Sequence, residues 1–123
     1  MPRKKKSENS FSEELNKVLQ AVADKKAEDL LVLDVSKIAG YTDHLVIATG
    51  KNAPQVQAMA DAVAAILKRP NAKGVHMEGF STANWVLIDG GDFVVHLFQP
   101  EARKFYALED LWGDAPQIKI EGL

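Results

Sequence analysis

The sequence predicts a single compact α/β domain in which about three helices pack against a mixed sheet of about five strands. The chain has 123 residues, a length typical of one domain, and 46% of them are hydrophobic. Apolar residues recur at helical spacing in some segments and in short runs in others, in the order α, β, β, α, β, β, β, α. We expect residues 10–116 to form the domain, between a basic flexible tail at 1–9 and a C-terminal tail at 117–123.

The first half of the chain contains two predicted helices and two predicted strands. A capping box at Ser10–Glu13 begins the first helix. Its apolar residues are Leu15, Val18, Leu19 and Val22. The apolar runs at 30–36 and 44–50 are typical of buried strands. Asn52 then caps a second helix, which ends at Pro70 and whose apolar stripe is expected in the core.

Residues 85–98 read WVLIDGGDFVVHLF and predict a β-hairpin, which follows a weaker strand signal at 74–79. Two apolar runs flank Gly90 and Gly91, and paired glycines suit the positive φ values of a two-residue hairpin turn. A turn at these two glycines sets the pairing of every residue along both strands.

With that turn, Asp89 lies opposite Asp92 and Trp85 lies opposite His96. Side chains alternate along a strand, so each side of the hairpin carries its own set. One set is Trp85, Leu87, Asp89, Asp92, Val94, His96 and Phe98. The other set is wholly apolar and is expected in the core: Val86, Ile88, Phe93, Val95 and Leu97. Two alternatives stay open for Trp85, which is either covered by a helix or available as an aromatic anchor for a partner.

A last helix is predicted from Pro100 to Gly113, with Phe105, Leu108 and Trp112 at helical spacing. Leu108 and Trp112 are expected in the core. The helix completes the pattern of a sheet packed against helices.

Glu109 and Asp110 fall near the predicted C-terminal end of this helix, where the helix dipole disfavours carboxylates by about 0.3–1 kcal/mol each. Neither has a basic residue three or four positions away. Either a basic partner supplies the missing positive charge, or the acidic end is simply solvated.

Charge is divided unevenly along the chain. Four basic residues, Arg3 to Lys6, lie in the tail, and from Ser7 onward eleven basic residues face seventeen acidic ones. An acidic body is a poor surface for a phosphate backbone and a suitable one for a basic protein, so the tail is expected to give at most weak contact with rRNA. The sequence has no cysteine and no apolar run near the ~20 residues that span a bilayer, so we expect a cytoplasmic protein without membrane contact.

Asp89, Asp92 and His96 are the candidates for catalysis or metal binding. A nucleotidyltransferase-like enzyme or a metal-dependent hydrolase would use them as ligands or acid–base groups. The two aspartates lie at a turn with no third carboxylate at a recognisable spacing, and the chain has no Gly-x-Ser-x-Gly, phosphate-binding loop or Gly-x-Gly-x-x-Gly. The sequence therefore favours a binding protein with no catalytic residue and no metal site.

Three stretches of the chain carry a family pattern: TDHLVIATG at 42–50, WVLIDGGDFVVHLF at 85–98 and RKFYALEDLWGDA at 103–115. In their order and spacing they resemble the ribosomal silencing factor family, also called the Iojap-like family. The resemblance extends from about Phe11 to Ala115. The chain departs from the family at Gly90, where a larger residue is common, and at Lys51, where Ser or Thr is common.

The resemblance implies an α/β fold related to nucleotidyltransferases but without their catalytic apparatus. It also implies a protein that binds the large ribosomal subunit through the fourteenth large-subunit ribosomal protein. Such binding blocks joining of the small subunit and represses translation when nutrients are scarce. The implied mechanism is steric occlusion, with no substrate and no cofactor. An apolar face of the sheet could also close a homodimer of the free protein, which would be released for the ribosome.

Eight residues are expected to bind the partner: seven match the family pattern, and Asp110 is added from the charge argument at the end of the last helix. They are Trp85, Asp89, Asp92, His96, Arg103, Tyr106, Glu109 and Asp110. Trp85 is expected to be an anchor, and the four carboxylates are expected to face basic groups.

Overall fold

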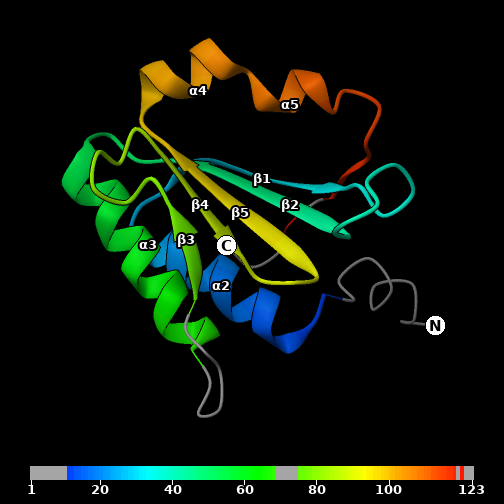
Figure 1. The fold of residues 1–123 in the computed structure, drawn as a ribbon, viewed down its shortest axis with the longest axis horizontal. Helices are drawn as coiled ribbons and strands as arrows, with labels where there is room; N and C mark the ends of the chain where they lie inside the picture. Colours follow the sequence, from blue (N-terminus) through cyan, green and yellow to red (C-terminus); the bar gives the residue numbers. More distant parts are fainter. Residues whose placement is uncertain (1–10, 69–74, 119, 121–123) are drawn as a thin grey trace.

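The computed structural model describes residues 11–68, 75–118 and 120, and six strands among them form one mixed sheet (Figure 1). The strands are β1 Glu28–Asp34, β2 His44–Thr49, β3 His76–Glu78, β4 Trp85–Asp89, β5 Phe93–Phe98 and β6 Gln117–Ile118. Their order across the sheet is β3-β4-β5-β2-β1-β6. β2 and β5 pair in parallel at the centre, and the other neighbours pair antiparallel. The predicted α/β class with a mixed sheet is confirmed.

The sixth strand corrects the predicted count of five. β6 lies in the stretch that the sequence predicts as a C-terminal tail, and it pairs with Val32 and Leu33 of β1. Its second residue, Ile118, packs against the core. A strand of two residues is too short to show periodicity, so the sequence carries no signal for it. The predicted basic tail at 1–9 lies outside the described residues.

Two helices, α2 (Glu13–Asp24) and α3 (Ala53–Leu67), cover one side of the sheet, which we call the first face (Figure 1). Both present apolar stripes to the sheet, and the apolar side of the hairpin meets them as predicted. The hairpin residues of this core are Val86, Ile88, Phe93, Val95 and Leu97. Within the described residues, no helix is long and apolar enough to cross a bilayer.

Side-chain caps begin both of these helices. The Oγ atom of Ser12 accepts a hydrogen bond from the Leu15 N–H at 3.0 Å, so the first helix begins two residues later than a cap at Ser10 predicts. Asn52 caps the second helix as predicted, and its Oδ1 atom accepts from the Gln55 N–H at 2.9 Å. Each cap satisfies one of the free N–H groups of a helix start.

The β4–β5 hairpin forms with a register two residues away from the predicted one. Trp85 pairs with Phe98 rather than with His96, because Gly91 and Asp92 form the turn. Of the two glycines in the predicted turn, only Gly91 has a positive φ, at +88°. A shift of two residues leaves the same side chains on each side of the sheet, so the predicted division into two sets holds.

Gly90 belongs to the hairpin ladder, not to the turn. Its N–H donates to the Phe93 carbonyl oxygen at 2.8 Å, and Asp89 pairs with Val94 instead of Asp92. A Cβ atom at Gly90 would lie 2.6 Å from the Phe93 ring. Glycine is therefore required at this position because the Phe93 ring leaves no room for a side chain, and not because of its backbone angle.

The opposite side of the sheet, the second face, carries α4 (Pro100–Tyr106) and α5 (Leu108–Leu111) in place of the single predicted helix (Figure 1). Ala107 separates them, with a left-handed φ of +42°. Alanine has no preference for this conformation, so the sequence does not reveal the break. Leu108 is buried against the second face as predicted, whereas Phe105 is exposed.

Candidate functional site

The second face is less completely covered by helices than the first. Among the described residues, α4 buries none of its side chains and α5 buries only Leu108. Three large apolar side chains of this segment are exposed: Phe105 at 80%, Tyr106 at 51% and Leu111 at 75%. Several exposed apolar side chains in one short segment indicate a binding surface.

Five rings connect this segment to the sheet, and we call Trp85, His96, Phe98, Phe105 and Tyr106 the aromatic cluster. The Trp85 ring stacks on Phe98 at a centroid distance of 5.0 Å and lies 4.7 Å from Tyr106, which in turn lies 5.0 Å from Phe105. Phe98 is fully buried and Phe105 is exposed, so the cluster extends from the core to the surface. Trp85 is half-buried, which combines the two predicted alternatives: α4 covers part of the indole and part stays accessible.

His96 holds the indole of Trp85 in place. The Trp85 Nε1–H donates to His96 Nδ1 at 3.0 Å. His96 is only 6% exposed, and this burial lowers its pKa to about 4, so the ring is neutral at pH 7. Because Nδ1 accepts a hydrogen bond, the ring proton lies on Nε2. His96 was predicted to bind the partner, but it lies beneath the surface. It orients Trp85, whose indole is partly exposed.

Arg103 and Glu109 form an ion pair within the chain. Arg103 Nε donates to Glu109 Oε2 at 3.1 Å, and Arg103 Nη1 donates to the Asp29 carbonyl oxygen and to Thr49 Oγ1, both at 2.8 Å. The Arg103 side chain is 12% exposed and that of Glu109 is 31% exposed. Glu109 Oε1 is buried and has no hydrogen-bond partner among the described residues.

Glu109 does not need a cation from a partner to offset a helix dipole. Because the helix breaks at Ala107, Glu109 and Asp110 lie in the first turn of α5, where carboxylates are favoured, and not at the end of a long helix. The cation near Glu109 is Arg103, six positions earlier in the chain, beyond the spacing of three or four that the sequence analysis considered. Asp110 is exposed.

The hairpin tip lies at the other end of β4 from Trp85. Asp89 Oδ1 accepts a hydrogen bond from the Gly91 N–H at 2.8 Å, and the Asp92 carbonyl oxygen accepts from the N–H groups of Asp43 and His44. Both aspartate side chains are exposed. Within the described parts of the chain, no group of three or more His, Asp or Glu side chains could hold a metal ion. The backbone contacts fix the shape of the tip and leave its two carboxylates on the surface.

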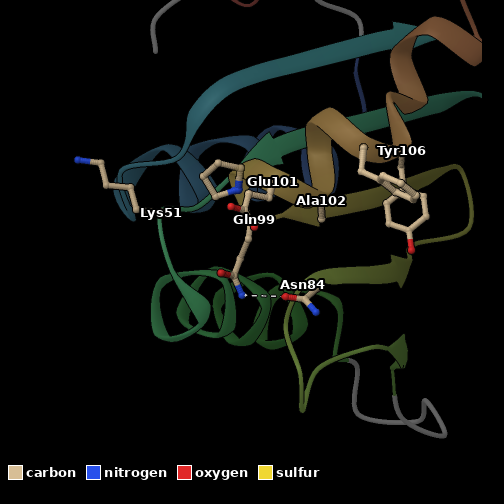
Figure 2. A pocket seen from close by; sticks show the side chains of 8 residues that line it. Lys51, Asn84, Gln99, Glu101, Ala102 and Tyr106 are labelled. Carbon is tan, nitrogen blue, oxygen red and sulfur yellow. Dashed lines mark hydrogen bonds between the residues drawn. The ribbon is translucent and has the colours of Figure 1, made fainter.

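A hollow of about 770 Å³ borders the aromatic cluster beneath α4 (Figure 2). Gln99 Nε2 donates to the Ala83 carbonyl oxygen and to Asn84 Oδ1, which fixes the amide groups on one side. Lys51 and Glu101 add one charge of each sign. The lining residues are Lys51, Asn84, Gln99, Pro100, Glu101, Ala102, Phe105 and Tyr106. The hollow can receive a polar side chain from a molecule that covers the aromatic cluster.

The structure divides the eight predicted residues into separate groups. Trp85, His96 and Tyr106 come together in the aromatic cluster, and Arg103 pairs with Glu109. The remaining three carboxylates are exposed at two places, Asp89 and Asp92 at the hairpin tip and Asp110 on α5.

Phe105 and Leu111 are exposed residues that the sequence analysis did not assign to the site. The spacing of Phe105, Leu108 and Trp112 predicts one buried stripe, but only Leu108 is buried and Trp112 is half-buried against the core. The available signal was the adjacent pair Phe105 and Tyr106, because consecutive side chains point about 100° apart around a helix, and a narrow stripe through Phe105, Leu108 and Trp112 leaves Tyr106 at its edge.

Known proteins are similar to this chain in sequence and in fold. The family model described as "Ribosomal silencing factor during starvation" matches residues 8–123. A protein of Halalkalibacterium halodurans named ribosomal silencing factor RsfS is 40% identical over 114 residues, which are 93% of this chain and 97% of that protein. A more distant relative in mouse, named mitochondrial assembly of ribosomal large subunit protein 1, is 29% identical over 102 residues, 80% of this chain and 45% of that protein.

A solved structure agrees with these matches. The crystal structure of a Chromobacterium violaceum protein is similar with a TM-score of 0.76 and 38% identity, and the match covers 82% of this chain and 84% of the other. Sequence and fold thus point to one family over nearly the whole domain. The chain belongs to the family of ribosomal silencing factors.

Proposed function

We propose that this protein binds the large ribosomal subunit and sterically blocks the joining of the small subunit, which represses translation when nutrients are limiting. The observation that carries the proposal is the exposed end of the aromatic cluster on the incompletely covered second face. Aromatic side chains that are held in place and partly exposed are typical anchors of protein interfaces. The family description and the name of the mouse relative support a ribosomal target.

The proposed partner on the subunit is the basic ribosomal protein of the fourteenth large-subunit family. From Ser7 onward, seventeen acidic residues against eleven basic ones favour a basic partner over bare rRNA. We assign direct contact to Trp85 and Tyr106 as anchors and to Asp89, Asp92 and Asp110 as charges that meet basic groups. Their exposure is compatible with these roles.

Three other predicted residues have supporting roles in this proposal. His96 orients the indole of Trp85, and Arg103 and Glu109 form an ion pair with each other inside the chain. In the free protein, the exposed apolar side chains Phe105 and Leu111 would favour pairing with a second copy. Such a homodimer would cover the surface until the ribosome competes for it. The basic tail would add only weak attraction to rRNA.

The mechanism requires no catalysis and no cofactor, and the protein would act in the cytoplasm. An enzyme built on Asp89, Asp92 and His96 is the disfavoured alternative, because His96 Nδ1 is occupied by the indole N–H and the burial of the ring opposes a charged form. Occlusion needs only a rigid domain that occupies the joining surface.

Sucrose-gradient sedimentation of cell extract tests the proposal. The protein is expected with free large subunits, and added protein should slow the joining of purified subunits. Equal recovery with small subunits, or unchanged joining at saturating protein, would contradict it. The ribosomal protein alone, immobilised, would separate binding to that protein from binding elsewhere on the subunit.

A further inference from the structure

We propose that Arg103 is a positioning residue, whose side chain fixes the bend between α4 and α5 and so holds the exposed end of the aromatic cluster in its binding arrangement. The family resemblance suggests direct partner contact for this arginine, but its side chain is only 12% exposed. The inference rests on the proposed function, because its binding experiments use the large ribosomal subunit as the partner. It concerns a different property, namely how the exposed end of the aromatic cluster is oriented.

The guanidinium of Arg103 connects four elements. It donates to Glu109 in α5, to Thr49 at the end of β2 and to the carbonyl oxygen of Asp29 in β1, while its own backbone belongs to α4. All three hydrogen bonds involve a charged donor, and such bonds are stronger than neutral ones. The planar fork of arginine can satisfy several fixed acceptors at once, which a lysine ammonium cannot do in the same geometry.

The same arginine contacts two residues with left-handed backbone. Asp29 has a φ of +49° in a stretch where the register of β1 against β2 shifts, and its carbonyl oxygen accepts from the Arg103 side chain. Ala107 has a φ of +42°, and its N–H donates to the Arg103 carbonyl oxygen at 2.8 Å. Residues other than glycine rarely adopt this conformation, and it persists where the surroundings hold it. Arg103 contributes its side chain at Asp29 and its backbone carbonyl at Ala107, so only the contact at Asp29 depends on the identity of residue 103.

Apolar packing alone does not fix α4 on the sheet. Among the described residues, no side chain of α4 is buried, and Leu108 is the buried side chain of α5. Tyr106 lies one turn after Arg103 in α4 and contacts Trp85 at 4.7 Å. Loss of the guanidinium contacts would therefore let Tyr106 move relative to Trp85 while the first face stays packed.

Three variants of the full chain test this inference: Arg103→Met, Arg103→Lys and Thr49→Val. Thr49 is 4% exposed and cannot reach a partner, so any effect of its hydroxyl on binding must pass through Arg103. We expect Arg103→Met to weaken binding to purified bacterial large ribosomal subunits about tenfold, and Thr49→Val about threefold. Arg103→Lys should fail to restore binding. Combined with Arg103→Met, Thr49→Val should add nothing, because both remove the same contact.

A spectroscopic readout separates a moved surface from a weakened fold. The indole ¹H–¹⁵N resonance of Trp85 should shift in all three variants, because Tyr106 lies against that ring. Backbone amide resonances of α2 and α3 should stay in place. Wild-type binding by Arg103→Lys together with unchanged binding by Thr49→Val would make Arg103 a simple charge contact and overturn the inference. If the wild-type protein does not bind the subunit, the proposed function fails. The spectroscopic test still applies in that case, because an unmoved Trp85 resonance would contradict the claim that Arg103 fixes the bend between α4 and α5.

Discussion

The two faces of the sheet use similar apolar residues but are covered to different extents. On the first face, α2 and α3 bury continuous apolar stripes against the strands. On the second face, α4 and α5 bury only Leu108 among their described residues and leave Phe105, Tyr106 and Leu111 exposed. Buried apolar area stabilises the fold, whereas exposed apolar area is available to a partner. The first face is built mainly for stability, and the second face is the one that we propose for binding.

The first face should respond to mutation through stability. Phe93→Ala removes a ring that is 1% exposed and covers Gly90, so the free energy of unfolding should fall by about 3–5 kcal/mol. Urea denaturation measures the change, with Phe93→Leu as a milder control. A loss of less than about 1 kcal/mol would show that the first face does not carry the stability assigned to it.

Acid should destabilise the second face through His96. The folded pKa of about 4 lies below the ordinary value near 6.5, so the unfolded chain binds the proton first. The contribution of His96 to stability is complete above pH 6.5 and is lost as the pH falls toward 4, by about 3 kcal/mol in total. Urea midpoints of the wild type and of His96→Gln from pH 7.5 to 4 isolate this group, because other titrations cancel in the difference. Parallel pH curves would contradict the assignment.

Trp85→Ala is expected to lower both the stability of the fold and the affinity for the partner. The indole is half-buried, so stability should fall by about 1–2 kcal/mol, less than for a core residue. The affinity for large subunits should fall by about 2 kcal/mol or more, as for an interface anchor. Trp85→Phe is the control, because it keeps an aromatic ring next to Phe98 and removes the indole N–H that donates to His96. A folded Trp85→Ala protein that binds normally would exclude Trp85 from the interface.

Asp110→Lys gives the smallest expected change in stability, so it separates an effect on binding from an effect on folding most clearly. The side chain is exposed at the start of a four-residue helix, so stability should change by no more than about 0.5 kcal/mol. Association with large subunits should slow several-fold at low salt, and the effect should fade as ionic strength rises. The matched control is Asp61→Lys, a charge reversal at an exposed position on α3. Equal slowing by both variants would indicate net charge, not a specific surface.

The first face could be predicted almost fully from the sequence. Periods of two and of 3.6 residues identify its strands and helices, and the Asn52 cap follows from local chemistry. The hairpin register was wrong because either glycine of the pair can enter the turn, and the choice depends on how the Phe93 ring packs on Gly90. The two sides of the hairpin were nevertheless assigned correctly, since a shift of two residues preserves them.

The second face could be predicted only in part. Its aromatic residues were identified through the family pattern, but the break at Ala107 and the role of Arg103 depend on contacts between distant parts of the chain. Arg103 reaches Thr49, 54 positions earlier, and Asp29, 74 positions earlier. Local periodicity contains no information about such contacts, so a bent segment was predicted as one straight helix.

The parallel pairing of β2 with β5 has a consequence for the order in which the protein folds. Paired residues such as His44 and Phe93 lie 49 positions apart, while β1 and β2 follow each other closely. Contacts between distant segments form late, because the intervening chain must close into a loop first. During synthesis, α4 and α5 emerge after β5, and of the described elements only β6 follows them. The surface proposed to act on ribosomes is thus among the last parts of the nascent chain to take shape on the ribosome that makes it.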